Sequence, residues 1–339
     1  MMERGRLDFD DPLFRPVKKL PTLAAIDAAL SRRGGPGWIR AGRAFESPAL
    51  HHRKALADDP DDLPELTRLA ARLEPALRRE FLQAVAALKS EIDLEALAAA
   101  VATGNVSVVE AAARLDDLAA RLDGMVPILR QGFLQGAGFA HQALASAGLT
   151  MRFDLVNPHA VTWVARHGAE LVTGISDQTR LALRDLVASS VGGGRDGRAT
   201  AREIRDVVGL TPRQATAVQN FRERLIEDGV AFEDVMRRGE RYAAAQLRLR
   251  AEGIARYETM NAENIGQQAL WREAKTQGLI DPEQTRRVVI VTPDERLCPT
   301  CEAVDGVEVG LEEPVETDLG SFLSPPFHQH VYLEEHNLV

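Results

Sequence analysis

The sequence predicts a mainly α-helical protein, a multi-helix body with an extended N-terminal arm and a small α+β domain at the C-terminal end. Apolar residues recur every three or four positions over most of the chain, and only 5% of the residues are aromatic. Both features favour helices over strands. The clearest strand signal is the run of four β-branched residues in RRVVIVT at 286–292. We therefore expect an arm over 1–60, a helical body over 61–256 and a C-terminal domain over 257–339.

The arm is predicted from composition. Residues 1–60 are rich in Pro, Gly and charged residues, and include the segment SRRGGPGW at 31–38. Such a composition does not bury enough apolar surface to form a packed core. We expect an extended segment, with at most a short helix near 22–30, that suits wrapping around a neighbouring chain in an assembly.

The helical body begins with one apolar stripe. Its members recur at three and four residues: Leu66, Leu69, Leu73, Leu77, Phe81, Val85 and Leu88. This spacing predicts a long amphipathic helix. Pro75 lies inside it and is expected to kink the helix or divide it into two.

Further helices follow from the same periodicity. The GGGRDG segment at 192–197 predicts a break between helices. Thr200 with Glu203, and Thr211 with Gln214, fit the capping box that begins a helix. We expect helices over 92–101, 108–122, 160–172, 176–190, 200–208 and 212–228, an Arg-rich helical stretch to 256, and a further helix from about 258 to 279. The pair over 200–228 has helix-turn-helix spacing, but the acids on its second helix favour a packing unit over a DNA reader.

One helical stretch carries no charge. Residues 131–150, QGFLQGAGFAHQALASAGLT, contain no Lys, Arg, Asp or Glu. Their several Gly, Gln and His residues make a poor membrane span. The composition predicts a buried helix of small residues, and we expect no contact with a membrane.

The acidic charge is concentrated at the C-terminal end. The net charge is -9, and from residue 281 onward there are 13 acidic residues against three arginines. That segment is a poor partner for nucleic acid, whose phosphates need local positive charge. The stretch 195–256 holds 13 arginines and 10 acidic residues, a weak positive excess for DNA binding.

The two cysteines of the chain lie in TPDERLCPTCEAVDG, at 298 and 301. Nearby acids disfavour the thiolate that redox chemistry needs. Cys298 and Cys301, together with His328 and His330, supply four ligands of the types that structural zinc prefers. His336 could replace either histidine. The other interpretation, which stays open, is that the thiols are small buried apolar groups and the histidines lie at a subunit contact or in solvent.

The same stretch resembles a known family. TPDERLCPTCEAVDGVEVGLEEP, followed by SPPFH, is similar to the C-terminal domain of the Mu F-like minor head proteins of tailed phages, also called phage head morphogenesis proteins. The matching residues are Asp294, Arg296, Cys298, Cys301, Asp305, Gly306, Pro325, Pro326 and His328.

Other blocks of the chain extend this resemblance over about residues 60–339. The helix IARYETMNAENIGQQALWREAKTQGL is similar to the family's Ala-Arg-Thr-Glu helix, with Tyr257 where Thr is usual and Glu258 matching. The stretches FDLVNPHAVTWVARHGAELVTGISDQTR and GLTPRQATAVQNFRERL are also typical. The family usually ends Pro-Pro-x-His-Pro-x-Cys-Arg-Cys, whereas here the later cysteines are absent and His330 is the candidate substitute.

The resemblance implies a structural role and no enzymatic activity. It indicates a minor capsid protein that associates with the portal or the major capsid protein during procapsid assembly in the bacterial cytoplasm and stays in the virion. An effect on genome packaging or ejection, and no small-molecule substrate, are also implied. The alternative is an internal protein that contacts genomic DNA through residues 195–256 and is ejected with it. We expect the leucine stripe to dock the body on the portal or capsid, and the C-terminal domain to present its acids outward.

Overall fold

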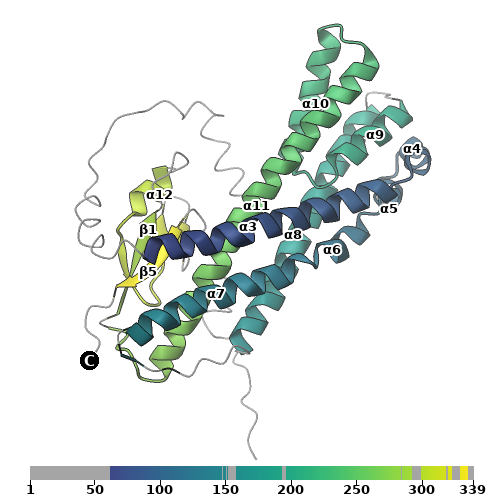
Figure 1. Cartoon of the computed structure of the whole chain (residues 1–339). Helices are drawn as coiled ribbons and strands as arrows, with labels where there is room; N and C mark the ends of the chain where they lie inside the picture. The colour runs from purple at the N-terminus through teal and green to yellow at the C-terminus, as the bar shows by residue number, and fades with distance from the viewer. Residues whose placement is uncertain are drawn as a thin grey trace, which may run out of the picture. The chain divides into compact units, whose positions relative to one another are not determined.

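The computed structural model describes residues 62–146, 148–149, 151, 158–192, 196–283, 285–291, 299–317, 320–322 and 329–334. The predicted arm over 1–60 lies outside these residues. The predicted fold class is confirmed, because helices dominate and the strands are short and gathered near the C-terminal end (Figure 1). No helix among the described residues is long and apolar enough to cross a membrane.

The helices are α3 (Asp62–Glu91), α4 (Leu94–Ala102), α5 (Val106–Ala112), α6 (Asp116–Leu122), α7 (Met125–Ser146), α8 (Pro158–Gly192), α9 (Gly197–Val207), α10 (Pro212–Glu227), α11 (Phe232–Thr276) and α12 (Pro299–Val304). The strands are β1 (Arg286–Val291), β2 (Glu308–Gly310), β3 (Val315–Thr317), β4 (Gly320–Phe322) and β5 (Gln329–Glu334).

Two compact units make up the described chain. We call residues 69–132 and 164–259 the body unit, and the described residues of 62–68, 133–163 and 260–339 the C-terminal unit. Residues 133–163 belong to the C-terminal unit because α7 packs there against the end of α11. The division predicted at residues 256 and 257 did not anticipate this grouping, which depends on contacts between segments far apart in the sequence.

The core of the body unit is one apolar cluster. On α3, Leu77, Phe81, Val85 and Leu88 are fully buried in it, together with residues of α4 to α11. The expectation that the leucine stripe docks the body on another protein is therefore wrong for these residues. Their apolar surface is used to hold the chain's own helices together.

Several helices are longer or shorter than predicted. Pro75 lies inside α3 without dividing it. One helix, α8, covers the two predicted segments 160–172 and 176–190, and the hydroxyl of Ser176 donates to the carbonyl of Val172 within it (2.9 Å). The predicted helix over 108–122 is divided instead, because Arg114 adopts the left-handed conformation with φ 54° between α5 and α6.

One of the two predicted capping boxes is confirmed. At the start of α10, the Thr211 hydroxyl accepts from the Gln214 N–H, and the Gln214 side chain accepts from the Thr211 N–H (both 3.2 Å). The box at Thr200 is wrong, because α9 begins earlier. Its cap is Asp196, whose carboxylate accepts from the Ala199 N–H (2.9 Å), and a carboxylate suits the positive end of a helix.

The C-terminal unit combines a close helix pair with small sheets. A Cβ on Gly136 of α7 would lie 2.0 Å from the Glu263 carbonyl oxygen, and one on Gly266 of α11 would lie 2.0 Å from the Phe133 carbonyl oxygen. Only glycine permits this approach of two backbones. The predicted buried helix of small residues is confirmed by this contact and by the burial of Ala137 and Ala140.

The strands form two antiparallel sheets in the order β2-β1-β5 and β3-β4. The predicted strand at 286–292 is confirmed as β1. A small apolar cluster of Val289, Val304, Val309 and Val315 joins β1, α12, β2 and β3. Val289 of β1 is therefore packed in a core, which is the environment that favours β-branched residues in strands.

Candidate functional site

The structure describes the backbone of two of the four predicted metal ligands. Cys298 and His328 fall outside the described residues, whereas the backbone of Cys301 lies in α12 and that of His330 in β5. The last pair of the ladder joins Val291 of β1 to Gln329 of β5. Val291, the last described residue before Cys298, and Gln329, the first described residue after His328, are therefore neighbours at one end of the sheet.

Helix α12, which contains the backbone of Cys301, contacts β1. Among the described side chains, no group of three or more His, Cys, Asp or Glu residues could hold a metal ion. The proposed ligands themselves are not among those side chains, so the zinc site stays a prediction.

The Asp-Gly step after the cysteines has a clear structural role. Gly306 adopts a φ of 76°, in the left-handed region that favours glycine. Its N–H donates to the Val289 carbonyl (2.7 Å), and the Val289 N–H donates to the Val307 carbonyl (2.9 Å). The turn that leads from α12 to β2 is thus fixed on the centre of β1.

Arg287 fixes the acidic loop that follows. It is 1% exposed, its Nε donates to the Gly310 carbonyl (3.2 Å), and its Nη2 donates to the Glu313 carbonyl. Burial, with Arg272 nearby, lowers the pKa of Arg287 to about 10, so it stays charged at neutral pH. Glu302, Glu308, Glu312, Glu313 and Glu316 are exposed, as expected for acids presented outward.

A partly buried His–Glu pair joins two blocks of the chain that carry the family resemblance. The His167 Nε2 of α8 lies 2.5 Å from the Glu258 Oε2 of α11, and these side chains are 16% and 3% exposed. Burial alone would lower the pKa of His167, but the charge and hydrogen bond of Glu258, with help from Glu170, raise it above its ordinary value. The two residues are 91 positions apart, and no local pattern in the sequence links them.

The charged centre of the body unit is Asp206 of α9. The Arg222 Nη2 of α10 lies 2.5 Å from the Asp206 Oδ2, and both side chains are buried. Gly239 of α11 makes room for this arginine, because a Cβ there would lie 2.2 Å from the Arg222 Nε. Burial raises the pKa of Asp206, although Arg222, Arg205 and Lys89 act in the opposite direction.

Lys89 of α3 completes this centre. Its ammonium donates to the main-chain carbonyl of Asp206 (2.8 Å). Burial lowers the pKa of Lys89 to about 8, with the positive charge of Arg205 adding to the effect and Asp206 opposing it. Sequence reasoning missed this group, because Lys89, Asp206 and Arg222 come from three different helices and each is an ordinary polar residue of its own helix.

A pocket of about 470 Å³ opens beside this centre. Its lining comes from α3, α9 and α11: Leu82, Ala86, Lys89, Ser90, Arg205, Asp206, Glu240, Ala244, Leu247 and Arg248. The walls are aliphatic and the polar groups are mainly charged. The volume lies within the range of small-ligand sites.

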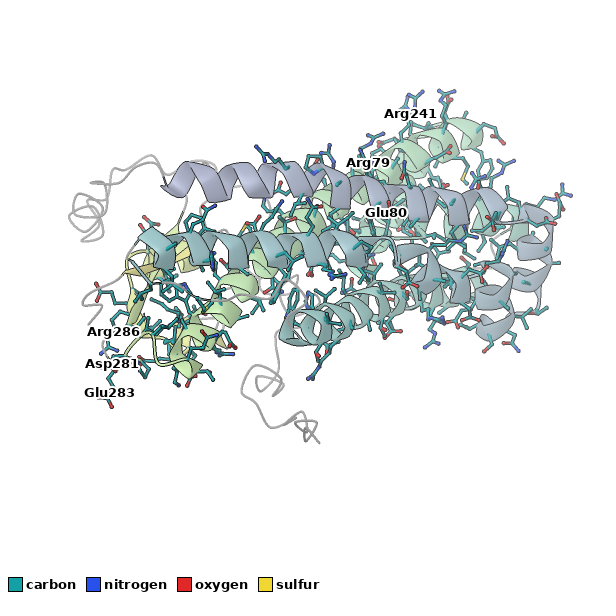
Figure 2. All side chains as sticks on the ribbon, turned by 60° about the horizontal axis from the view of Figure 1, so that its bottom comes forward. Arg79, Glu80, Arg241, Asp281, Glu283 and Arg286 are labelled. Atoms are coloured by element: carbon teal, nitrogen blue, oxygen red, sulfur yellow. The ribbon has the colours of Figure 1, made fainter. Side chains whose placement is uncertain are left out.

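Many arginines of the stretch 195–256 are engaged inside the body unit. Arg222 is buried against Asp206, and Arg250 donates to the Gly209 carbonyl and to Gln178 (both 2.7 Å). Arg198, Arg202, Arg205, Arg237 and Arg256 also have acidic partners. Within the described part of the chain, the exposed arginines 238, 241 and 248 of α11 have no ion pair. Figure 2 shows Arg241 projecting from this helix. The surface available to DNA phosphates is thus smaller than the count of arginines suggests.

Comparison with models of protein families, with curated proteins and with solved structures finds no match.

Proposed function

We propose that this protein is a minor structural protein of the head of a tailed phage or phage-like particle, without enzymatic activity. It associates with the portal during procapsid assembly in the bacterial cytoplasm, remains in the virion, and affects genome packaging or ejection. The major capsid protein is the other proposed neighbour.

The Asp305-Gly306 step is the observation that carries the proposal. It belongs to the motif by which the sequence resembles Mu F-like head proteins, and it fixes the turn after α12 on the centre of β1. The glycine of the motif therefore has a structural role in this chain, because the backbone conformation at Gly306 favours glycine. A second support is that Glu258 and His167, from two other blocks of the resemblance, form a partly buried pair.

The proposal is tested by co-expressing the full chain with the portal and major capsid proteins of the same genome and separating the products by size. The chain is expected to elute with portal rings or procapsids. A folded chain that elutes alone, with neither protein, would contradict the proposal.

A matched pair of glycine variants sharpens this test. Gly306 and Gly229 both have positive φ, at 76° and 74°, but only Gly306 belongs to the C-terminal unit. Replacing either by valine strains the backbone by about 1–2 kcal/mol. Gly306→Val should lose association with the portal, and Gly229→Val should keep it. Equal association of both variants would show that the C-terminal unit is not needed.

The proposed cofactor is structural zinc, held by Cys298, Cys301, His328 and His330. When bound, it would cross-link α12, which contains Cys301, to β5, which contains His330, and this suits a unit with a small apolar core. Elemental analysis of the purified chain should find stoichiometric zinc that is lost in the Cys298→Ser, Cys301→Ser variant and kept in His336→Gln. Zinc-free protein whose melting is unchanged by a chelator would rule the site out.

A further inference from the structure

We infer that the pocket between α3, α9 and α11 of the body unit binds a carboxylate carried on an aliphatic chain. This binding site goes beyond the proposed role in assembly, and its ligand is bound rather than converted, so the expectation of no small-molecule substrate is kept. The carboxylate would belong either to a free aliphatic acid or to an acidic side chain of a peptide.

The charge balance of the pocket favours an anion. The Asp206 carboxylate is already bound by Arg222 from α10, so the charges of these two groups largely cancel. The pocket then has three cations, Lys89, Arg205 and Arg248, and one further acid, Glu240. Glu240 lies 3.9 Å from Arg205, a separation that permits only a weak ion pair.

Two of these cations are available to a ligand. Lys89 donates to a main-chain carbonyl, and within the described part of the chain no carboxylate lies within ion-pairing distance of it. Arg248 is exposed and has no ion pair among the described residues. An ammonium and a guanidinium that face one cavity are suited to the two oxygens of a carboxylate.

The apolar residues that line the pocket favour an aliphatic chain as the rest of the ligand. Leu82 and Ala86 of α3 face the same cavity as Ala244 and Leu247 of α11, and no aromatic residue lines it. A nucleobase would lack the aromatic surface on which bases usually stack. An aliphatic chain would instead bury apolar surface against these four side chains, which stabilises the complex.

Lys89 makes the affinity depend on pH. A bound carboxylate favours the charged ammonium, whereas burial and Arg205 favour the neutral amine and lower the pKa of Lys89 to about 8. Asp206, Arg205 and Glu240 face it from α9 and α11, and Arg222 acts through Asp206. Binding should therefore weaken as the pH rises through about 8, and it should be accompanied by proton uptake near that pH.

Ligand-observed NMR on the full chain tests the inference with four probes: hexanoate, hexylamine, inorganic phosphate and a blocked Leu-Glu-Leu peptide. Hexanoate or the peptide should show saturable binding at millimolar concentration, and the tighter of the two identifies the source of the carboxylate. Hexylamine should not bind, and phosphate should bind more weakly than either carboxylate. Absence of saturable binding for both carboxylate probes, or phosphate binding as tight as theirs, would overturn the inference.

Three variants locate the site. Arg248→Gln removes an exposed side chain, so the fold should be kept while affinity for the carboxylate falls about tenfold, as expected for a lost charge-assisted hydrogen bond. Lys89→Met should weaken binding similarly and abolish its pH dependence. Arg241→Gln, on the same helix but outside the pocket lining, should leave affinity unchanged. An equal loss in Arg241→Gln and Arg248→Gln would mean that the anion binds to the general surface charge of α11.

Discussion

The body unit and the C-terminal unit differ in what fills their interiors. The body unit has one continuous apolar cluster, to which α3 contributes Leu77, Phe81, Val85 and Leu88. The C-terminal unit has two smaller clusters, and its buried residues include the polar side chains Glu263, Asn264, Gln267, Gln268 and Arg287. The body is therefore stabilised mainly by apolar burial. The C-terminal unit has less apolar core, and the backbones of its helices α7 and α11 approach closely.

Loss of apolar volume in the body should give the largest effect. Phe81 is fully buried, with the Arg250 guanidinium 5.9 Å from its ring centre. Phe81→Ala should lower the free energy of unfolding by about 3–5 kcal/mol, because it removes apolar contacts and leaves a cavity. Chemical denaturation followed by circular dichroism measures this.

The matched control is Phe232→Ala at the start of α11, where the side chain is 52% exposed. It should change stability by no more than about 0.5 kcal/mol. Similar losses for Phe81→Ala and Phe232→Ala would refute the assignment of the α3 stripe to the internal core.

Added side-chain volume between α7 and α11 should destabilise the C-terminal unit. Gly136→Ala would place a methyl group 2.0 Å from the Glu263 carbonyl oxygen, an atom of helical backbone that cannot rotate aside. The expected cost is about 1–3 kcal/mol in thermal or chemical unfolding. A methyl group on Gly138, two residues further along α7, would meet no neighbouring atom within 4 Å. Gly138→Ala should instead stabilise the helix by about 0.5–1 kcal/mol. A tolerated Gly136→Ala would contradict the close packing of α7 against α11.

The smallest effect on stability should come from a change in pH. The pKa of His167 is raised in the folded protein, so its pairing with Glu258 contributes stability that is fully present below the unfolded value of about 6.5. This contribution is lost as the pH rises through the folded pKa. The melting temperature should fall by about a few degrees over that range, and His167→Gln should remove this part of the dependence. A wild-type melting temperature that rises over the same pH range would contradict a stabilising His167–Glu258 pair.

Local patterns predicted much of the helical fold. The three-and-four spacing indicated the buried face of α3, the β-branched run indicated β1, and the Thr211–Gln214 box marked the start of α10. The predictions were wrong where contacts between residues far apart in the sequence determine the structure. Burial of Leu171, Val172 and Ile175 in the body core favours one continuous α8 where local signals predicted two helices. The sequence also could not show that the leucine stripe faces other helices of the same chain.

The candidate sites were less predictable than the fold. Cys298, Cys301, His328 and His330 stood out because of residue type and spacing. The pocket beside Asp206 has no such signature. Lys89, Arg205 and Arg248 are far apart in the sequence, and only the packing of α3, α9 and α11 brings them to one cavity.

The role in assembly is tested most directly by quantitative mass spectrometry of purified particles formed by the full set of head proteins of the same genome. The account predicts that the chain is present in the particles at a copy number far below that of the major capsid protein, and that Gly306→Val lowers its amount while Gly229→Val does not. Particles that contain none of the chain, while folded chain remains in the lysate, would contradict the proposed function.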